Sequence, residues 1–212
     1  MTLFRRLQMP SIGIIGTGMI GGAIALRLGA KGIAATVANS RGPETLKDLV
    51  AKAGPSITAG TSQEAASKDI VFLSVNWPKL QGVLAGLPNW NNRILIDTNN
   101  PMQRPPLPPI DVAGRASSAI IQEWAPGARV VKAFNHHYFM NLEKAPDADG
   151  GRRVLFYAGD DEAAKAEVAK LIDQLGFFGL DLGDIEHGSR LFQSPGGPLI
   201  AHDFVKIDSP LP

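Results

Sequence analysis

Short apolar runs recur along the chain, and segments with apolar residues at helical spacing separate most of them. Runs of about four to eight apolar residues, bounded by turn signals, are typical of strands that are buried on both faces. Strands that alternate with helices predict an α/β fold with a doubly wound, mostly parallel sheet. The segments that we interpret as strands are 12–15, 33–38, 56–59, 69–75, 93–97 and 129–134.

The segments between these runs supply the expected helices. The first presents apolar residues over 20–28, and Gly29 and Gly32 are expected to close it. Ser117 or Ser118 is expected to cap a helix over 117–124. Further helices are predicted to start near residues 43, 61 and 78, and a smaller pattern after Gly151 comprises a strand over 152–158, a helix that ends at Gly176 and a strand over 177–182.

Residues 16–21 have the spacing Gly-x-Gly-x-x-Gly between the first predicted strand and helix. In this setting Gly16 permits a tight turn, Gly18 lets a pyrophosphate approach the backbone, and Gly21 lets the helix pack close to the sheet. Free N–H groups and the dipole at the helix start favour the negative charge of a phosphate. The pattern predicts dinucleotide binding by a Rossmann-type fold, with an ordinary glycine turn as the alternative.

Polar residues follow the second predicted strand: Asn39, Ser40 and Arg41. An NAD site usually has a carboxylate about 20 residues beyond the glycines to hold the ribose 2′-hydroxyl, and this segment has none. Arg41 can offer a planar donor fork and Ser40 a hydroxyl group. We therefore predict that Ser40 and Arg41 bind the 2′-phosphate of NADP(H). The alternative interpretation is a polar loop before the helix that begins at Pro43.

Composition removes several classes of function. The formal net charge is +1, which gives no long-range attraction to nucleic acid or to an anionic membrane, so neither partner is expected. No apolar stretch reaches the ~18 residues of a membrane-spanning helix. The first ten residues lack a signal-peptide pattern and are interpreted as a short leader. The absence of cysteine excludes disulfides and thiolate chemistry, and the cytoplasm is the expected location.

Five prolines between Pro101 and Pro109 exclude a regular element in that segment. One interpretation is an inert irregular loop. The other is a loop that crosses the carboxyl end of the sheet, where such folds bind ligands.

Signatures of other catalytic schemes are missing from the chain. There is no Gly-x-Ser-x-Gly and no His-Glu-x-x-His, and neither tyrosine has a lysine four residues later. His136 and His137 are adjacent, and on a strand they would point to opposite faces, so no metal site is expected. A hydride donor without an obvious acid–base pair suits a flavin-like acceptor ring, which carries the difficult chemistry itself.

Several motifs, taken in order, resemble one family. They are GIIGTGMIGGAIA, NSRGPE, the strand that ends at Val75, DTNNP at 97–101, VKAFN at 131–135 and PGGP at 195–198. From about residue 11 to the tail, the chain resembles the NADPH-dependent reductases of the deazaflavin coenzyme F420, the F420H2:NADP oxidoreductases. The glycine motif occurs in many families, whereas the combination of NSRGPE with VKAFN is more specific.

This resemblance implies hydride transfer between NADPH and a deazaflavin, coenzyme F420, that stacks on the nicotinamide. It also implies a homodimer, in which a leader (1–10) precedes a Rossmann NADP-binding domain (11–135) and a small C-terminal portion (136–212) packs on the same sheet. The residues that it places against NADP(H), beside Gly16, Asn39, Ser40 and Arg41, are Thr17, Gly18, Met19, Ile20, Val75, Asn76, Trp77, Pro78, Ala133, Phe134 and Asn135. The deazaflavin would lie below the loop from Asn99, with Asn135, His136 and His137 as candidates lining the acceptor pocket.

Three other functions compete with this one. The first is an NADPH-dependent reductase of another flavin, ferric iron or a small organic substrate; the cytoplasmic domain of the six-transmembrane ferric reductases has a similar plan. The second is a β-hydroxyacid dehydrogenase, imine reductase or pyrroline-carboxylate reductase, but the eighty residues after Lys132 are too few and too mixed for their helical domain. The third is a non-catalytic NADPH sensor.

Overall fold

The computed structural model describes residues 10–103 and 105–207, so the expected leader, apart from Pro10, lies outside the described residues. Its strands form one sheet in the order β10-β8-β6-β5-β4-β1-β2-β3, with β7 and β9 also paired to β8. The pairs from β3 to β6 are all parallel, which confirms the predicted doubly wound α/β fold. These six strands are β1 (Ile12–Ile15), β2 (Ala35–Ala38), β3 (Ile57–Ala59), β4 (Ile70–Leu73), β5 (Ile94–Asp97) and β6 (Arg129–Ala133).

Helices cover both faces of this sheet, because successive strand residues point to opposite sides. On β4, Phe72 packs in one apolar cluster, whereas Val71 and Leu73 pack in the other. Helices α1, α2, α6 and α7 lie over the first face, and α3, α4 and α5 lie over the second. The helices are α1 (Met19–Ala30), η1 (Pro43–Leu46), α2 (Lys47–Ala53), α3 (Ser62–Ala66), η2 (Trp77–Lys79), α4 (Leu80–Ala85), α5 (Ser117–Trp124), α6 (Phe139–Glu143), α7 (Glu162–Gln174) and η3 (Ser189–Phe192).

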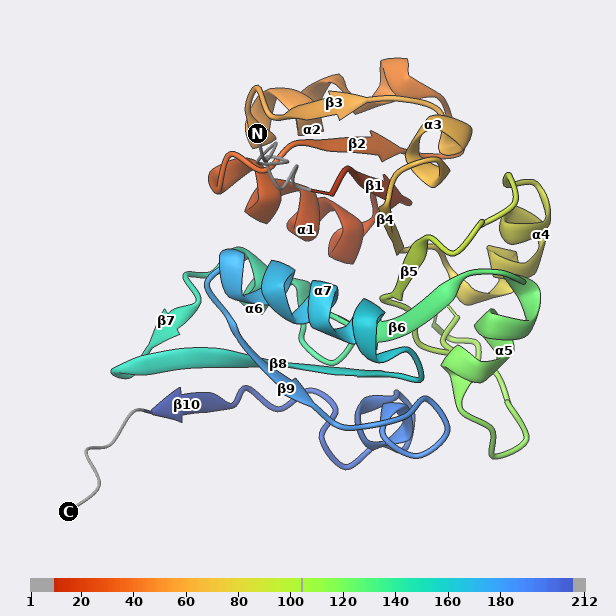
Figure 1. The fold of residues 1–212 in the computed structure, drawn as a ribbon, viewed down its shortest axis with the longest axis vertical. Helices are drawn as coiled ribbons and strands as arrows, with labels where there is room; N and C mark the ends of the chain where they lie inside the picture. The colour runs from red at the N-terminus through yellow and green to blue at the C-terminus, as the bar shows by residue number, and fades with distance from the viewer. Residues whose placement is uncertain (1–9, 104, 208–212) are drawn as a thin grey trace, which may run out of the picture.

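The C-terminal part continues the sheet through one long strand, β8 (Gly151–Gly159), which pairs antiparallel with β6. The same strand pairs with β7 (Asp147–Ala148), β9 (Phe178–Asp181) and β10 (Val205–Ile207). Figure 1 shows this arrangement, with the N-terminal strands in red and orange above and the C-terminal elements in blue below.

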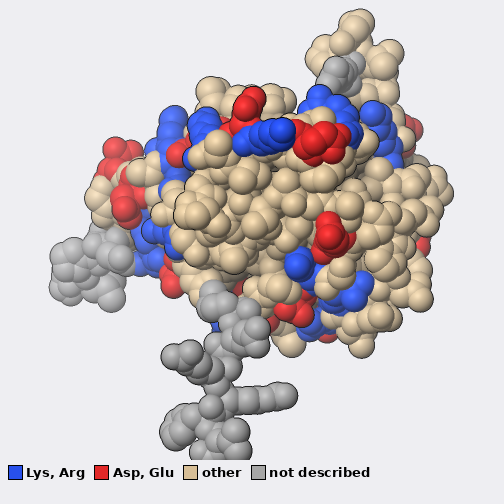
Figure 2. Space-filling view, turned by 90° about the horizontal axis from the view of Figure 1, so that it is seen from above, with Lys and Arg blue, Asp and Glu red and all other residues tan. Residues whose placement is uncertain are grey.

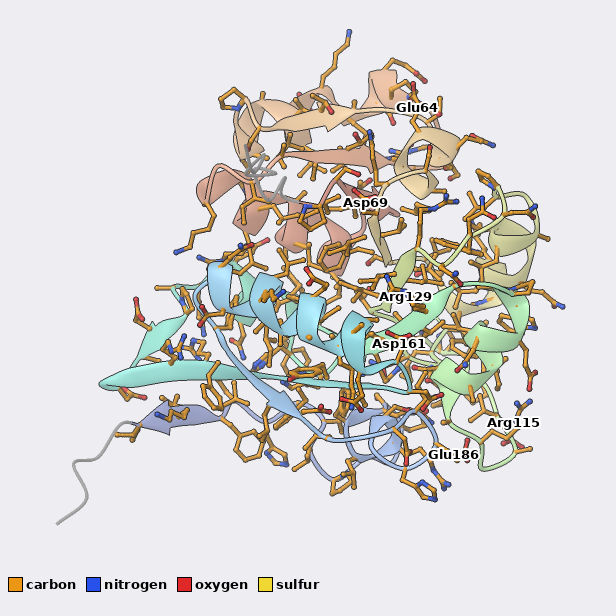
Figure 3. The ribbon with its side chains drawn as sticks, viewed as in Figure 1. Glu64, Asp69, Arg115, Arg129, Asp161 and Glu186 are labelled. Carbon is orange, nitrogen blue, oxygen red and sulfur yellow. The ribbon has the colours of Figure 1, made fainter. Side chains whose placement is uncertain are left out.

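Polar side chains fix several element boundaries (Figure 3). The Asp69 carboxylate accepts hydrogen bonds from the backbone N–H and the hydroxyl of Ser11, at 2.8 and 2.7 Å, and so ties the start of β1 to β4. These bonds lower the pKa of Asp69. Asp161 caps α7 by accepting from the Ala164 N–H at 2.7 Å and also pairs with Arg129 of β6. The starts of three strands and one helix are thereby anchored.

Several boundaries differ from the sequence-based expectation. Helix α1 continues through Gly29 to Ala30, so Gly29 does not end it. A Cβ at Gly29 would lie 2.0 Å from the Ala53 carbonyl oxygen, which indicates that this glycine permits close packing against α2. Strand β6 ends at Ala133, and Phe134 has a positive φ of 64°. The prediction that a serine caps α5 was wrong, since the N-cap is Ala116 and makes no side-chain cap bond.

Charged side chains of both signs are interspersed on the face of the molecule that Figure 2 shows. A mixed surface of this kind fits the near-zero net charge of the chain. Among residues 10–103 and 105–207, no helix combines the length and the apolar character that crossing a membrane requires.

Candidate functional site

Two adjoining cavities open at the carboxyl ends of β1 and β4, where the strand order changes direction. Ligands of doubly wound sheets bind at this switch point. The cavities share Gly18, Ser74, Val75 and Asn76 and have volumes of about 380 and 430 Å³. We call the smaller one, which extends toward residues 39–41, the nucleotide cavity, and the larger one, which extends toward residues 135–138, the acceptor cavity.

The glycine turn has the close contacts that its spacing predicts. Gly16 has a φ of +94°, and a Cβ there would lie 2.0 Å from the Ser74 carbonyl oxygen. A Cβ at Gly21 would lie 1.9 Å from the Gly16 carbonyl oxygen. At Gly18, by contrast, nothing lies within 4 Å of an added Cβ, so the backbone there faces open space. The turn is closed on its protein side and open on its cavity side, which fits the approach of a pyrophosphate.

Helix α1 starts directly after this opening. Its N-cap is Gly18, and its first turn contains no acidic side chain. Met19 projects into solvent with 70% of its surface exposed and also lines the acceptor cavity. The positive end of a twelve-residue helix therefore faces the point where the two cavities meet.

The loop after β2 forms one wall of the nucleotide cavity. The Asn39 side chain shapes it, because Oδ1 accepts from the Arg41 N–H at 2.8 Å and Nδ2 donates to the Thr45 hydroxyl at 2.9 Å. Ser40, Arg41, Ser62 and Lys79 supply hydroxyl groups and positive charge to the lining, and no lining residue is acidic. This composition favours an anionic group.

Asn99 forms the floor beneath the acceptor cavity. Its Oδ1 accepts from the Val75 N–H at 2.9 Å, while its Nδ2 donates to the Leu73 carbonyl and to Asp97 Oδ1, each at 2.9 Å. The side chain thus joins the carboxyl ends of β4 and β5 and holds the backbone at a residue that both cavities share.

A fully buried ion pair lies behind this floor. Lys132 Nζ lies 3.3 Å from Asp97 Oδ2, and both side chains have no exposed surface. Lys132 also donates to the Asn99 carbonyl at 2.9 Å and to the Ser117 hydroxyl at 3.2 Å, and the Ser118 hydroxyl donates to Asp97 at 2.6 Å. Burial lowers the pKa of Lys132, and the charge of Asp97 opposes that shift. The two serines predicted as caps are therefore used by this ion pair.

His136 and His137 lie side by side in the wall of the acceptor cavity. Their ring centroids are 4.2 Å apart, and Nε2 of each lies near the Val154 carbonyl oxygen, at 3.3 and 2.9 Å. Since a carbonyl oxygen only accepts hydrogen bonds, both hydrogens are assigned to Nε2. Burial lowers the pKa of both imidazoles, that of His136 well below its ordinary value, so they are uncharged at neutral pH. The expectation that they point to opposite faces was wrong, because β6 ends before them.

A reciprocal pair of amides closes the acceptor cavity on the C-terminal side. Asn100 Nδ2 donates to the Asn135 carbonyl at 2.9 Å, and Asn135 Nδ2 donates to Asn100 Oδ1 at 3.0 Å. Asn135 also donates to the Phe192 carbonyl at 2.7 Å, and Asn100 Oδ1 accepts from the Ser194 N–H at 2.9 Å. These bonds bring Ser194 into the cavity wall. The Ala201 N–H donates to the His136 carbonyl at 2.9 Å and brings residues 200–201 there as well.

Most of the residues singled out from the sequence lie around the two cavities. Gly16, Thr17 and Asn39–Arg41 line the nucleotide cavity, and Gly18, Val75 and Asn76 line both. Those that line the acceptor cavity are Met19, Ile20, Asn99, Asn135, His136 and His137.

Four of the residues singled out lie elsewhere. Trp77 is buried against Trp124, with ring centroids 5.8 Å apart. Ala133 and Phe134 are buried in the core, and Pro78 is exposed outside both linings.

Sequence reasoning missed other lining residues. In the nucleotide cavity these include Ser62 and Lys79, and in the acceptor cavity they include Thr98, Asn100, Met102, Tyr138, Ser194, Ile200 and Ala201. Met102 belongs to the proline-rich segment, so that loop contributes to the cavity wall. Within the part of the chain that the structure describes, no group of three or more His, Asp or Glu side chains is arranged to hold a metal ion.

Comparison with known proteins connects this site to nicotinamide chemistry. Residues 11–101 match the family described as NADP oxidoreductase, coenzyme F420-dependent. A hypothetical protein from Sinorhizobium meliloti has 38% identity to the chain and a TM-score of 0.88, with 93% of this chain and 96% of that one covered. A protein assigned by name as an F420-dependent NADP-reductase, from Arthrobacter sp. FB24, has 29% identity and a TM-score of 0.71, with 83% and 86% covered.

A curated relative and a more distant structure extend the comparison. Metalloreductase STEAP3 of Rattus norvegicus is 31% identical over 181 residues, which cover 84% of this chain. The chain spans only 35% of the length of that relative. A reductive aminase from Aspergillus terreus, in complex with NADPH and ethyl levulinate, has 19% identity and a TM-score of 0.60, with 85% of this chain and 57% of that one covered, and so shares the fold alone.

The matched segment contains the glycine turn, the loop after β2 and the carboxyl ends of β4 and β5, which are the elements that build the nucleotide cavity and the floor of the acceptor cavity. This region of the chain, residues 11–101, matches the family of coenzyme F420-dependent NADP oxidoreductases.

Proposed function

We propose that this chain transfers a hydride between NADPH and a deazaflavin ring, coenzyme F420, that stacks on the nicotinamide in the acceptor cavity. The observation that carries the proposal is the pair of cavities that meet at Gly18 and residues 74–76. One cavity has the charge that suits a phosphorylated nucleotide. The other has the size and the neutral lining that suit a flat heterocycle.

Different residues would bind the phosphates of NADPH and position its nicotinamide. The open backbone at Gly18 and the start of α1 would hold the pyrophosphate, and Ser40 and Arg41 the 2′-phosphate. Asn99 fixes the backbone of Val75, where the nicotinamide would rest. NADPH, when bound, supplies the hydride, and one proton from water completes reduction of the acceptor. Proximity of two rings and exclusion of water would supply most of the rate.

A reductase of another acceptor is the second candidate, because the metalloreductase STEAP3 is 31% identical to this chain. Such an enzyme would use the same nucleotide cavity and pass electrons to a free flavin or to ferric iron. It would differ from an F420 reductase only in what the acceptor cavity receives.

The first experiment mixes the purified protein with NADPH and oxidised F420 and follows the loss of deazaflavin absorbance. Parallel reactions contain NADH in place of NADPH, or FMN or a ferric chelate in place of F420. Rapid bleaching with NADPH alone supports the proposal. Turnover of FMN or ferric chelate without F420 bleaching supports the second candidate. NADPH binding without any turnover refutes both and favours a sensor.

A further inference from the structure

Two cations from separate elements face the nucleotide cavity. Arg41 comes from the loop after β2, and Lys79 comes from η2, which follows β4. In Figure 1, β2 ends on the side of the molecule where α4 lies, so the two segments reach the same edge of the sheet. Neither cation forms an ion pair with an acidic group among residues 10–103 and 105–207.

This convergence favours an anion. The nucleotide cavity has no acidic lining residue, so nothing in its wall balances the charges of Arg41 and Lys79. Two positive charges that face one cavity repel each other, and an anion bound between them adds an attraction to each that offsets this repulsion. The hydroxyl groups of Ser40 and Ser62 add hydrogen-bond donors to the same wall.

The backbone of Lys79 is held firmly in place. Trp77, two residues earlier, is buried against Trp124, and Leu80, the next residue, has no exposed surface. The Lys79 N–H donates to the Asn76 carbonyl at 2.9 Å, and Asn76 itself lines both cavities. Only the flexible stem of Lys79 is therefore left to adjust to a ligand, which reduces the entropy lost on binding.

We propose that Lys79 is a specificity-determining residue that binds, together with Arg41, the 2′-phosphate monoester of NADPH. This inference rests on the proposed NADPH binding. The guanidinium of Arg41 offers two parallel donors to two phosphate oxygens, and the ammonium group of Lys79 acts as a point charge on the remaining oxygen. A dianionic phosphate thus meets two cations in an acid-free wall.

The test uses 2′,5′-ADP, which carries the adenosine and the 2′-phosphate but no nicotinamide, and compares it with 5′-ADP by calorimetry. Lys79→Ala is expected to weaken 2′,5′-ADP about tenfold or more, the factor that loss of one charge-assisted hydrogen bond produces. Binding of 5′-ADP should hardly change. Lys79→Arg should retain most of the preference, and Arg41→Ala/Lys79→Ala should abolish it.

Lys52→Ala is the matched control, because it removes one exposed positive charge that does not line either cavity. Equal weakening of both nucleotides by Lys79→Ala would move Lys79 to the 5′-phosphates and overturn the inference, as would no weakening at all. A wild-type protein that does not distinguish 2′,5′-ADP from 5′-ADP would refute NADPH selectivity itself. Because these probes contain no nicotinamide, failure to reduce F420 does not affect the result.

Discussion

The buried pair of Lys132 and Asp97 leads to a prediction about stability. Lys132→Met leaves the Asp97 carboxylate buried without its cation, although the Ser118 hydroxyl and two donors of Asn99 still reach it. Breaking a buried pair by removing one partner costs about 3–5 kcal/mol. Since three hydrogen bonds to Asp97 survive, we expect a value near the lower end, about 3 kcal/mol.

Asp97→Asn leaves the other partner unpaired. Lys132 then keeps only the Asn99 carbonyl and the Ser117 hydroxyl as acceptors, and its pKa, already lowered by burial, falls further. We therefore expect a loss of about 3–5 kcal/mol. The double variant Asp97→Asn/Lys132→Met has no buried charge and should recover much of this loss.

Thermal unfolding provides the assay. Each kcal/mol shifts the Tm of a domain of 150–250 residues by about 2–4 °C, so the single variants should lose roughly 6–20 °C. Lys170→Met is the control, because Lys170 and Glu167 form an exposed pair, whose loss should leave Tm almost unchanged. A double variant that is as unstable as the two losses added together would refute the reasoning, since it would show no coupling between the two charges.

Three further predictions concern the cavities. Arg41→Ala should weaken NADPH about tenfold or more and leave NADH nearly unchanged, because charged hydrogen bonds contribute about 1.5–3 kcal/mol each; fluorescence titration with equal losses for both cofactors would contradict this. Gly21→Ala should abolish tight NADPH binding and lower Tm, because its Cβ would lie 1.9 Å from the Gly16 carbonyl oxygen; a variant with unchanged Kd and Tm would contradict it. Because burial lowers the pKa of His136 and His137, the unfolded chain binds protons more readily than the folded one, and stability should fall as the pH drops below 6.5. The variant His136→Gln/His137→Gln should show a weaker pH dependence of Tm between about pH 7.5 and 5.5, a range that brackets the ordinary histidine pKa. An identical pH dependence of Tm in the variant and the wild type would show that these histidines do not cause the loss of stability.

The sequence predicted the strands well where burial on both faces leaves a continuous apolar run. The segment 69–75 contains β4, and 93–97 contains β5. Short elements such as β7 and β10 carry no such run, and their strand conformation depends on pairing with β8. β7 comes just before β8 in the sequence, whereas β10 is distant from it. Local pattern alone could not reveal them.

The site residues were predictable from the sequence where one short segment contains all the residues of a motif, as in the glycine turn. Lys79 and Ser62 were missed because only the strand order brings them to the loop at Ser40–Arg41. The roles of Ser117 and Ser118 were mistaken for the same reason, since their partners lie on β5 and β6. Spacing along the chain does not report contacts across a sheet.

The small overlap between the two cavities has an evolutionary consequence. Every residue of the nucleotide cavity lies within 15–83, whereas the acceptor cavity takes most of its own wall from residues 98–201. The family match, which ends at residue 101, covers the whole of the first set but stops before the acceptor-cavity residues between 102 and 201. Substitutions could therefore exchange one electron acceptor for another without disturbing the dinucleotide, and relatives that share the first set are free to diverge in what they reduce.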